Sequence, residues 1–135
     1  MTTEERLQAF PVLAQLRTHL TPETFLVSLA EMAADGYRMF AASYDGQIKG
    51  VAGISIGRNF YYGRYMWVYD LVTDDSHRSR GVGAALLSHL EEVARDAGCD
   101  TLALSSGLQR ADAHRFYEDK MGYERFSYTF SKKLG

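Results

Sequence analysis

The stretch Arg78-Ser79-Arg80-Gly81-Val82-Gly83-Ala84-Ala85 joins a strongly β-type run to a helical pattern, and this junction decides the fold. The run before it, residues 65–73, is rich in aromatic and β-branched side chains, which favour strands. After it, apolar residues recur from Leu86 at i, i+1, i+4, i+7 and i+8, as on one face of a helix. The segment therefore predicts a strand, a polar glycine-rich loop and a helix.

A loop of this kind presents backbone N–H groups at the start of a helix, where they lack helical partners and the helix dipole favours an anion. Gly81 and Gly83 let an anion approach the backbone without meeting a Cβ atom. Arg78 and Arg80 add positive charge. We interpret the loop as a cradle for a diphosphate; the simpler alternative is a turn that only starts a helix.

Two common diphosphate loops do not fit these residues. A nucleoside triphosphatase loop needs Lys and then Ser or Thr after its second glycine, where this chain has Ala84 and Ala85. The dinucleotide fingerprint needs a small third residue, where this chain has Leu86. Its glycines also follow the strand directly, whereas the polar residues 74–80 intervene here.

Residues 78–83 match the pattern R-x-x-G-x-G, which resembles the acyl-CoA pyrophosphate loop of the GNAT superfamily of N-acetyltransferases. Residues 112–118, followed by Met121-Gly122-Tyr123, resemble the last sequence block of that family, and residues 70–73 look like a small bacterial-type subgroup. The resemblance implies acetyl-CoA as the acyl donor. It also implies an α/β fold whose mixed central sheet is split at the main strand, with helices on both faces.

The chain departs from the family pattern in three places. The first strand that usually precedes the first helix is absent, and the tail has room for one strand rather than two. Arg110 stands where many members carry an Asn that holds the pantetheine arm.

Composition is that of one ordinary globular domain, residues 1–135, with 46% apolar residues. A net charge of −2 argues against non-specific nucleic-acid binding, and no run is long enough to span a membrane. The lone Cys99 cannot form an internal disulfide, which favours a reducing cytoplasm. No spacing of His or Cys suggests a metal site.

The first half predicts two helices and a hairpin. Residues 4–19 predict a helix that Pro11 should kink or restart, and a Thr-Pro start signal predicts a second helix to Ala34. These helices either only cover the core or line the acceptor site at their junction, residues 19–23. Strands are predicted over residues 37–44 and 48–56.

The turn between those strands, Asp45-Gly46, is a type I′ hairpin signal, and residues 57–63 predict an aromatic loop. The main strand, its following helix and a strand over residues 101–105 predict a right-handed parallel crossover. Residues 112–120 predict a short helix and residues 123–133 a last strand.

The resemblance assigns the donor site. In that family, unpaired backbone groups at the split strand bind the acyl carbonyl and the pantetheine amides, and β-bulges can free such groups. The candidate cofactor-binding residues are Leu71, Val72, Thr73, Arg78, Ser79, Arg80, Gly81, Val82, Gly83 and Ala84.

Acyl transfer from a thioester to an amine needs an uncharged amine, a polarised carbonyl and an acid for the leaving thiolate. Tyr117 matches the tyrosine that protonates the thiolate in that family, and a phenol with a pKa of about 10 can donate at neutral pH. The alternative is an aromatic side chain that packs in the core.

Asp70 is the unusual residue of the main strand. Strand alternation places it on one face with Met66, Val68 and Val72. A carboxylate among apolar neighbours is costly unless it is paired or functional. Asp70 could take the amine proton or attract a cationic acceptor; alternatively it is a structural partner of a backbone N–H or an Arg. The catalytic Glu of some relatives falls near Trp67, so water could serve as the base.

The leading hypothesis is an N-acetyltransferase that acts by direct attack in a ternary complex on a small cationic amine or a peptide amine. Two alternatives stay open, a non-catalytic acyl-CoA-binding regulatory module and a structural domain whose loop binds nothing. The predicted tail strand aligns Phe126, Tyr128 and Phe130 in one row, which either packs on the chain's own helices or supports a homodimer.

The Tyr117→Phe variant tests the acid. We expect acetyl-CoA binding to persist while turnover falls roughly 10- to 1000-fold, because the thiolate loses its proton donor. Binding and thiol-release kinetics measure the two effects. Turnover at the wild-type level would mean that Tyr117 only packs.

Overall fold

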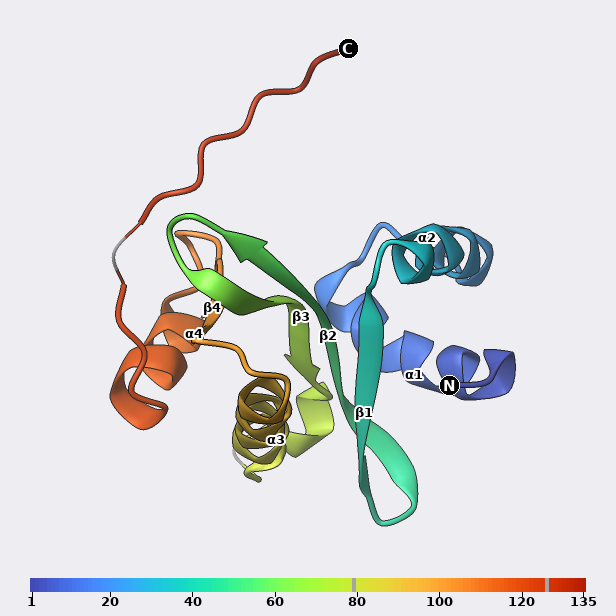
Figure 1. Ribbon diagram of the computed structural model, residues 1–135. Coiled ribbons are helices and arrows are strands. Elements are labelled where there is room, and N and C mark those ends of the chain that lie inside the picture. Colours follow the sequence, from blue (N-terminus) through green and yellow to red (C-terminus); the bar gives the residue numbers. More distant parts are fainter. Residues whose placement is uncertain (79, 126) are drawn as a thin grey trace. The chain divides into compact units, whose positions relative to one another are not determined.

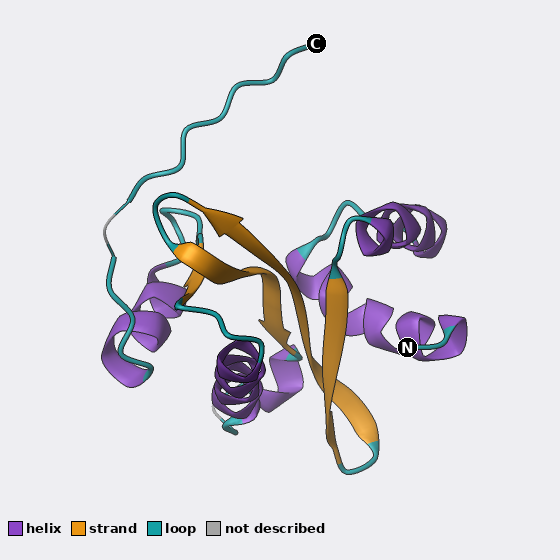
Figure 2. Ribbon diagram, viewed as in Figure 1, coloured by secondary structure: helices purple, strands orange, loops and turns teal. Residues whose placement is uncertain are grey.

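A four-stranded sheet with the order β1-β2-β3-β4 organises the chain (Figures 1 and 2). The computed structural model describes residues 1–78, 80–125 and 127–135. The strands are β1 (Arg38–Tyr44), β2 (Gln47–Asn59), β3 (Gly63–Thr73) and β4 (Thr101–Leu104). The first three are antiparallel neighbours and β4 runs parallel to β3, which confirms the predicted mixed sheet.

Both hairpins follow from local sequence. Asp45 and Gly46 have φ angles of 52° and 78°, and two positive values are what a type I′ turn requires. The second hairpin is tighter than predicted, because β2 continues to pair with β3 as far as Asn59 opposite Gly63. Only residues 60–62 remain as the loop, so the prediction of a loop over residues 57–63 was wrong at both ends, because β2 runs on to Asn59 and β3 begins at Gly63.

Two helices precede the sheet, α1 (Thr3–Leu16) and α2 (Pro22–Ala34). Thr21 caps α2 as predicted, since its hydroxyl accepts the backbone N–H of Thr24 at 3.2 Å and Pro22 is the first helical residue. Pro11 neither ends nor restarts α1. The buried side chains on both sides of Pro11 hold that helix in place; they are Ala9, Val12 and Leu13.

The sheet has a helical layer on each face (Figure 1). Val51 and Val72 share one apolar cluster with α1 and α2. The opposite face carries α3 (Val82–Asp96), whose start packs close to β2. A Cβ atom on Gly50 would lie 2.7 Å from Val82 Cγ1, so glycine is needed for this approach. In the described part of the chain, no helix combines the length and apolar character needed to cross a bilayer.

A β-bulge interrupts β3. Gly53 pairs with Asp70 whereas the next residue of β2, Ile54, pairs with Val68, so Tyr69 is the extra residue. Paired residues project to the same face, and neighbours along β2 alternate. Asp70 and Val72 therefore face α1 and α2, whereas Met66 and Val68 face the other way. The prediction that these four residues share one face was wrong, because alternation along a strand cannot reveal a bulge.

The split at the main strand is visible in the register. Only Tyr65–Val68 of β3 pair with β4, so the strand runs on through Thr73 with β2 as its only strand neighbour in the described sheet. A short 3₁₀ turn, η1 (Asp75–His77), then leads from β3 toward α3.

Residues 105–135 form a second compact unit. Its helix α4 (Ala111–Arg115) widens into a π-helical turn, η2 (Phe116–Lys120), and Gly122 follows with a φ of 76°. The predicted strand over residues 123–133 was wrong, since the described residues there belong to no strand. A segment of alternating aromatic residues forms a strand only where the edge of a sheet offers hydrogen-bond partners. Here the side chains of Tyr128 and Phe130 are exposed. Phe126 lies outside the described residues.

Gly53→Ala tests the packing around the bulge. A Cβ atom there would overlap the hydroxyl of buried Tyr37, so we expect a loss of about 1–3 kcal/mol in unfolding free energy. The matched control is Gly57→Ala on the same strand, whose Cβ would lie 3.0 Å from the half-buried Tyr65 hydroxyl. Urea denaturation measures both variants, and equal stabilities would contradict the prediction.

Candidate active site

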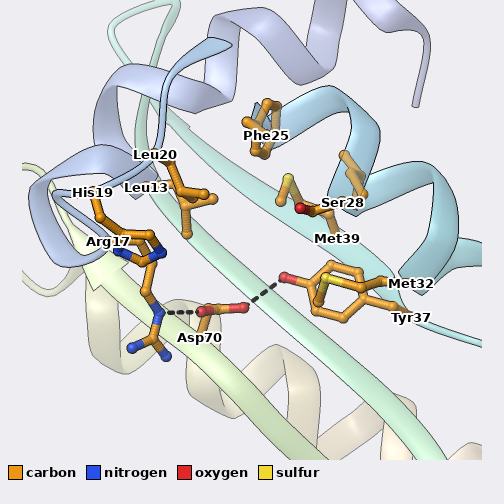
Figure 3. A pocket seen from close by; sticks show the side chains of 11 residues that line it. Leu13, Arg17, His19, Leu20, Phe25, Ser28, Met32, Tyr37, Met39 and Asp70 are labelled. Carbon is orange, nitrogen blue, oxygen red and sulfur yellow. Dashed lines mark hydrogen bonds and ion pairs between the residues drawn. The ribbon is translucent and has the colours of Figure 1, made fainter. Parts of the chain in front are cut away.

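A mostly apolar pocket of about 380 Å³ lies on the face of the sheet that α1 and α2 cover (Figure 3). Its lining comes from both helices, their connection and two strands: Leu13, Arg17, His19, Leu20, Phe25, Ser28, Leu29, Met32, Tyr37, Met39 and Asp70. The junction between α1 and α2 thus contributes His19 and Leu20 to this pocket. One of the two sequence interpretations expected the junction to line the acceptor site, and that role stays a prediction.

Asp70 supplies the pocket with a carboxylate that is only 8% exposed. Tyr37 donates its phenolic O–H to Oδ2 at 2.7 Å, and Arg17 donates Nε–H to Oδ1 at 2.8 Å. Figure 3 shows these two donors approaching the carboxylate from opposite sides. Each oxygen keeps a further lone pair for another donor.

Arg17 connects the end of α1 to the bulge in β3. It is the C-cap residue of α1, and besides the carboxylate its Nη2 group donates to the backbone carbonyl of Tyr69 at 2.9 Å. Tyr69 is the extra residue of the bulge. Two acceptors on β3 thus fix the guanidinium, whose planar fork of donors suits such paired contacts.

Tyr37 is 6% exposed, just ahead of β1, and the bare backbone of Gly53 leaves space for its ring. Burial, reinforced by the negative charge of Asp70, raises the pKa of the Tyr37 phenol far above its usual range. Tyr37 therefore stays protonated and remains a hydrogen-bond donor to Asp70 throughout the physiological pH range.

The sequence left two interpretations of Asp70 open, and the structure contains elements of both. As the structural interpretation expected, Asp70 forms an ion pair with an arginine, Arg17. Its carboxylate also lines a pocket, as a functional role would require. Sequence reasoning missed Arg17 and Tyr37. A buried carboxylate signals that partners exist, but no spacing identifies residues 53 and 33 positions away.

The glycine-rich loop begins α3 as predicted. Gly81 is the N-cap in the left-handed region with a φ of 80°, and no side chain caps the helix there. The first helical bond runs from the Ala85 N–H to the Gly81 carbonyl, so the N–H groups of residues 82–84 point out of the helix start. Ser79 lies outside the described residues.

The two arginines of the loop are exposed. Arg78 forms an ion pair with Asp75 at 2.7 Å, and both side chains are in water, where such pairs exchange readily. Both guanidinium groups are thus within the first unit and accessible to an anionic ligand.

Asp74 anchors the segment that leads into this loop. Its carboxylate accepts hydrogen bonds from Ser76 and from Gln15 of α1, the latter at 2.7 Å, and these bonds hold its pKa far below the usual range. Gln15 in turn accepts the backbone N–H of Asp75 at 2.9 Å, and Lys49 of β2 lies 3.9 Å from the Asp74 carboxylate. The connection is therefore tied to both a helix and a strand.

The remaining candidates lie in two places. Leu71, Val72 and Thr73 form the end of β3 beyond its pairing with β4, in the same unit as the loop. Tyr117 belongs to the second unit, half-buried between the rings of Phe116 and Tyr123. Burial raises the pKa of its phenol, and the positive charge of Arg110, the N-cap of α4, opposes that rise.

Comparison with known proteins identifies the family. The profile of the acetyltransferase (GNAT) family matches residues 3–123. The chain belongs to the GNAT family. This acetyltransferase has the family's mixed sheet, and membership implies acetyl-CoA as the acyl donor.

Two curated relatives and one solved structure resemble this GNAT protein. An uncharacterized N-acetyltransferase of Bacillus subtilis is 42% identical over 97% of this chain and 93% of the relative. An aminoalkylphosphonate N-acetyltransferase of Salmonella typhimurium is 31% identical over 98% of this chain and 88% of the relative. The structure of an aminoglycoside N-acetyltransferase in complex with CoA superposes with a TM-score of 0.87 at 19% identity, over 99% and 91% of the chains, and shares the fold.

Calorimetric titration with CoA tests the loop. Gly83→Val places a branched side chain where a phosphate would lie, and Arg78→Ala removes a charge-assisted contact worth about 1.5–3 kcal/mol. We expect weaker binding in both variants with the fold intact. Arg95→Ala, which removes an exposed ion pair with Glu91 at the other end of α3, is the matched control. Unchanged affinity in both test variants would reject this loop as the CoA site.

Proposed function

We propose that this protein transfers an acetyl group from acetyl-CoA to the primary amine of a small molecule bound in the pocket beside Asp70. The observation that carries the proposal is a buried carboxylate at the surface of a mostly apolar pocket, in a chain of the acetyltransferase family. Such a pocket suits one amino group on a partly apolar body.

The reaction proceeds by direct attack. The uncharged amine nitrogen attacks the thioester carbonyl carbon, the C–S bond breaks, and the thiolate takes a proton. We assign that proton to Tyr117, the grip on the CoA diphosphate to residues 78–84, and contacts with the acyl and pantetheine groups to the backbone of residues 71–73. Asp70 keeps one free lone pair on each oxygen and can accept hydrogen bonds from the amine.

One relative suggests a narrower acceptor class. The Salmonella relative is named for aminoalkylphosphonates, which carry an amine and an anionic group in one small molecule. Arg17 and His19 both line the pocket of this chain and could pair with such an anion. Aminoalkylphosphonates are therefore the second candidate acceptors, beside amines that carry only an apolar body.

A thiol-release screen with acetyl-CoA tests the function. The acceptors are 2-aminoethylphosphonate, phenethylamine, an aminoglycoside and a lysine-containing peptide. We expect release with at least one small amine, and a loss of about tenfold or more in kcat/KM for Asp70→Asn, because the amide keeps only one oxygen that can accept a hydrogen bond from the amine. Release with the peptide alone would exclude a small-molecule acceptor. CoA binding without release on any amine would favour the non-catalytic regulatory module.

A further inference from the structure

The pocket contains a positive charge in the place where a cationic acceptor would bind. Arg17 Nε lies 2.8 Å from Asp70 Oδ1, and the second contact with the Tyr69 carbonyl keeps the guanidinium from turning away. The pair has no net charge. The pocket as a whole therefore does not have the negative field that an isolated buried carboxylate would produce.

The other groups that face the pocket do not restore a negative charge. His19, on the connection between α1 and α2, carries no negative charge, and Tyr37 stays protonated. The lining from α2 is Phe25, Ser28, Leu29 and Met32, and β1 contributes Met39, none of which titrates. Among the described residues that line the pocket, Asp70 on β3 is the one carboxylate, and Arg17 neutralises it.

An amine bound to Asp70 must share that carboxylate with Arg17. An ammonium there would lie within about 4–6 Å of the guanidinium, a distance at which like charges disfavour the charged form. The apolar lining adds a desolvation cost for the same form. Without Arg17 the sign would reverse, because an unpaired Asp70 would stabilise the ammonium and hold the amine in its unreactive state.

We propose that Arg17 makes the acceptor pocket favour the uncharged form of the bound amine. The inference rests on the proposed function, in which the acceptor binds beside Asp70. The ammonium gives one proton to water on binding, and the free lone pair then attacks the thioester. The second nitrogen proton leaves to water as the amide forms. The thiolate takes one proton from Tyr117, whose phenolate is reprotonated from water, so one net proton is released per turnover. No side chain of the pocket has to act as a strong base.

Proton release on binding tests the inference without turnover. The wild-type protein saturated with CoA, which carries no acetyl group, is titrated with phenethylamine at about pH 7.5, where the free amine is almost entirely protonated. Calorimetry in two buffers of different ionisation heat counts the protons. We expect close to one proton released per amine bound. Binding without proton release would overturn the inference and leave the proposed function intact.

Variants of Arg17 separate its charge from its packing. Arg17→Lys keeps the positive charge and should keep most of the proton release, whereas Arg17→Gln should lose most of it and bind the protonated amine more tightly. Equal loss in both would assign Arg17 a structural role and overturn the inference. Thermal unfolding and CoA affinity check the fold. If the Gln variant does not fold, the inference can still be overturned by the two other measurements, namely by wild-type binding without proton release or by a loss of proton release in Arg17→Lys.

The pH dependence of kcat provides a second readout. In Arg17→Gln we expect a lower KM for phenethylamine at neutral pH, a kcat lower by about tenfold, and a profile displaced upward by roughly 1–2 pH units. Arg17→Lys should keep the wild-type position. His19→Gln is measured in parallel to remove the imidazole from the pocket, and proton release should persist in it. An unmoved Arg17→Gln profile would overturn the inference, whereas no thiol release on any amine speaks against the proposed function itself.

Discussion

A carboxylate buried away from water must have partners, and the surroundings of Asp70 are arranged to provide them. The bulge at Tyr69 turns Asp70 toward the face that α1 and α2 cover. Gly53, directly opposite on β2, leaves space for the Tyr37 ring, and the end of α1 brings Arg17 within 2.8 Å. Without space at Gly53 for Tyr37, or without Arg17, the buried carboxylate would lose a hydrogen bond. Without the bulge, Asp70 would face the other side of the sheet. The bulge, the glycine and the end of the helix thus serve a single electrostatic requirement.

Features set by neighbouring residues were predictable from the sequence. The Thr21 cap, the Asp45-Gly46 turn and the start of α3 after the glycine-rich loop each depend on a few adjacent residues whose backbone preferences are strong. The mixed sheet followed from the order of such elements. The family, too, was readable, because residues 78–83 and 112–123 form two separate blocks in the expected order.

Features set by distant residues were not predictable in this way. The bulge depends on how β2 and β3 align, and the sequence of β3 alone reads as a regular alternation. Arg17 and Tyr37 come from elements that only the folded chain brings to Asp70. In the tail, by contrast, the sequence predicted a strand that the structure lacks. Its aromatic residues alternate as in a strand, but the described residues of the tail pair with no strand of the sheet. The donor-site residues, the role of Tyr117, a cytoplasmic location and a homodimer stay predictions.

The pocket and the glycine-rich loop belong to opposite faces of the sheet. The pocket lies on the face of α1 and α2, and the glycine-rich loop belongs to α3 on the opposite face. Substitutions of Ser28 or Met32, which line the pocket from α2, can therefore reshape the pocket without touching residues 78–84 of the loop. Under the proposed function, the acceptor could therefore change through the pocket while the loop that would hold the CoA diphosphate stays the same.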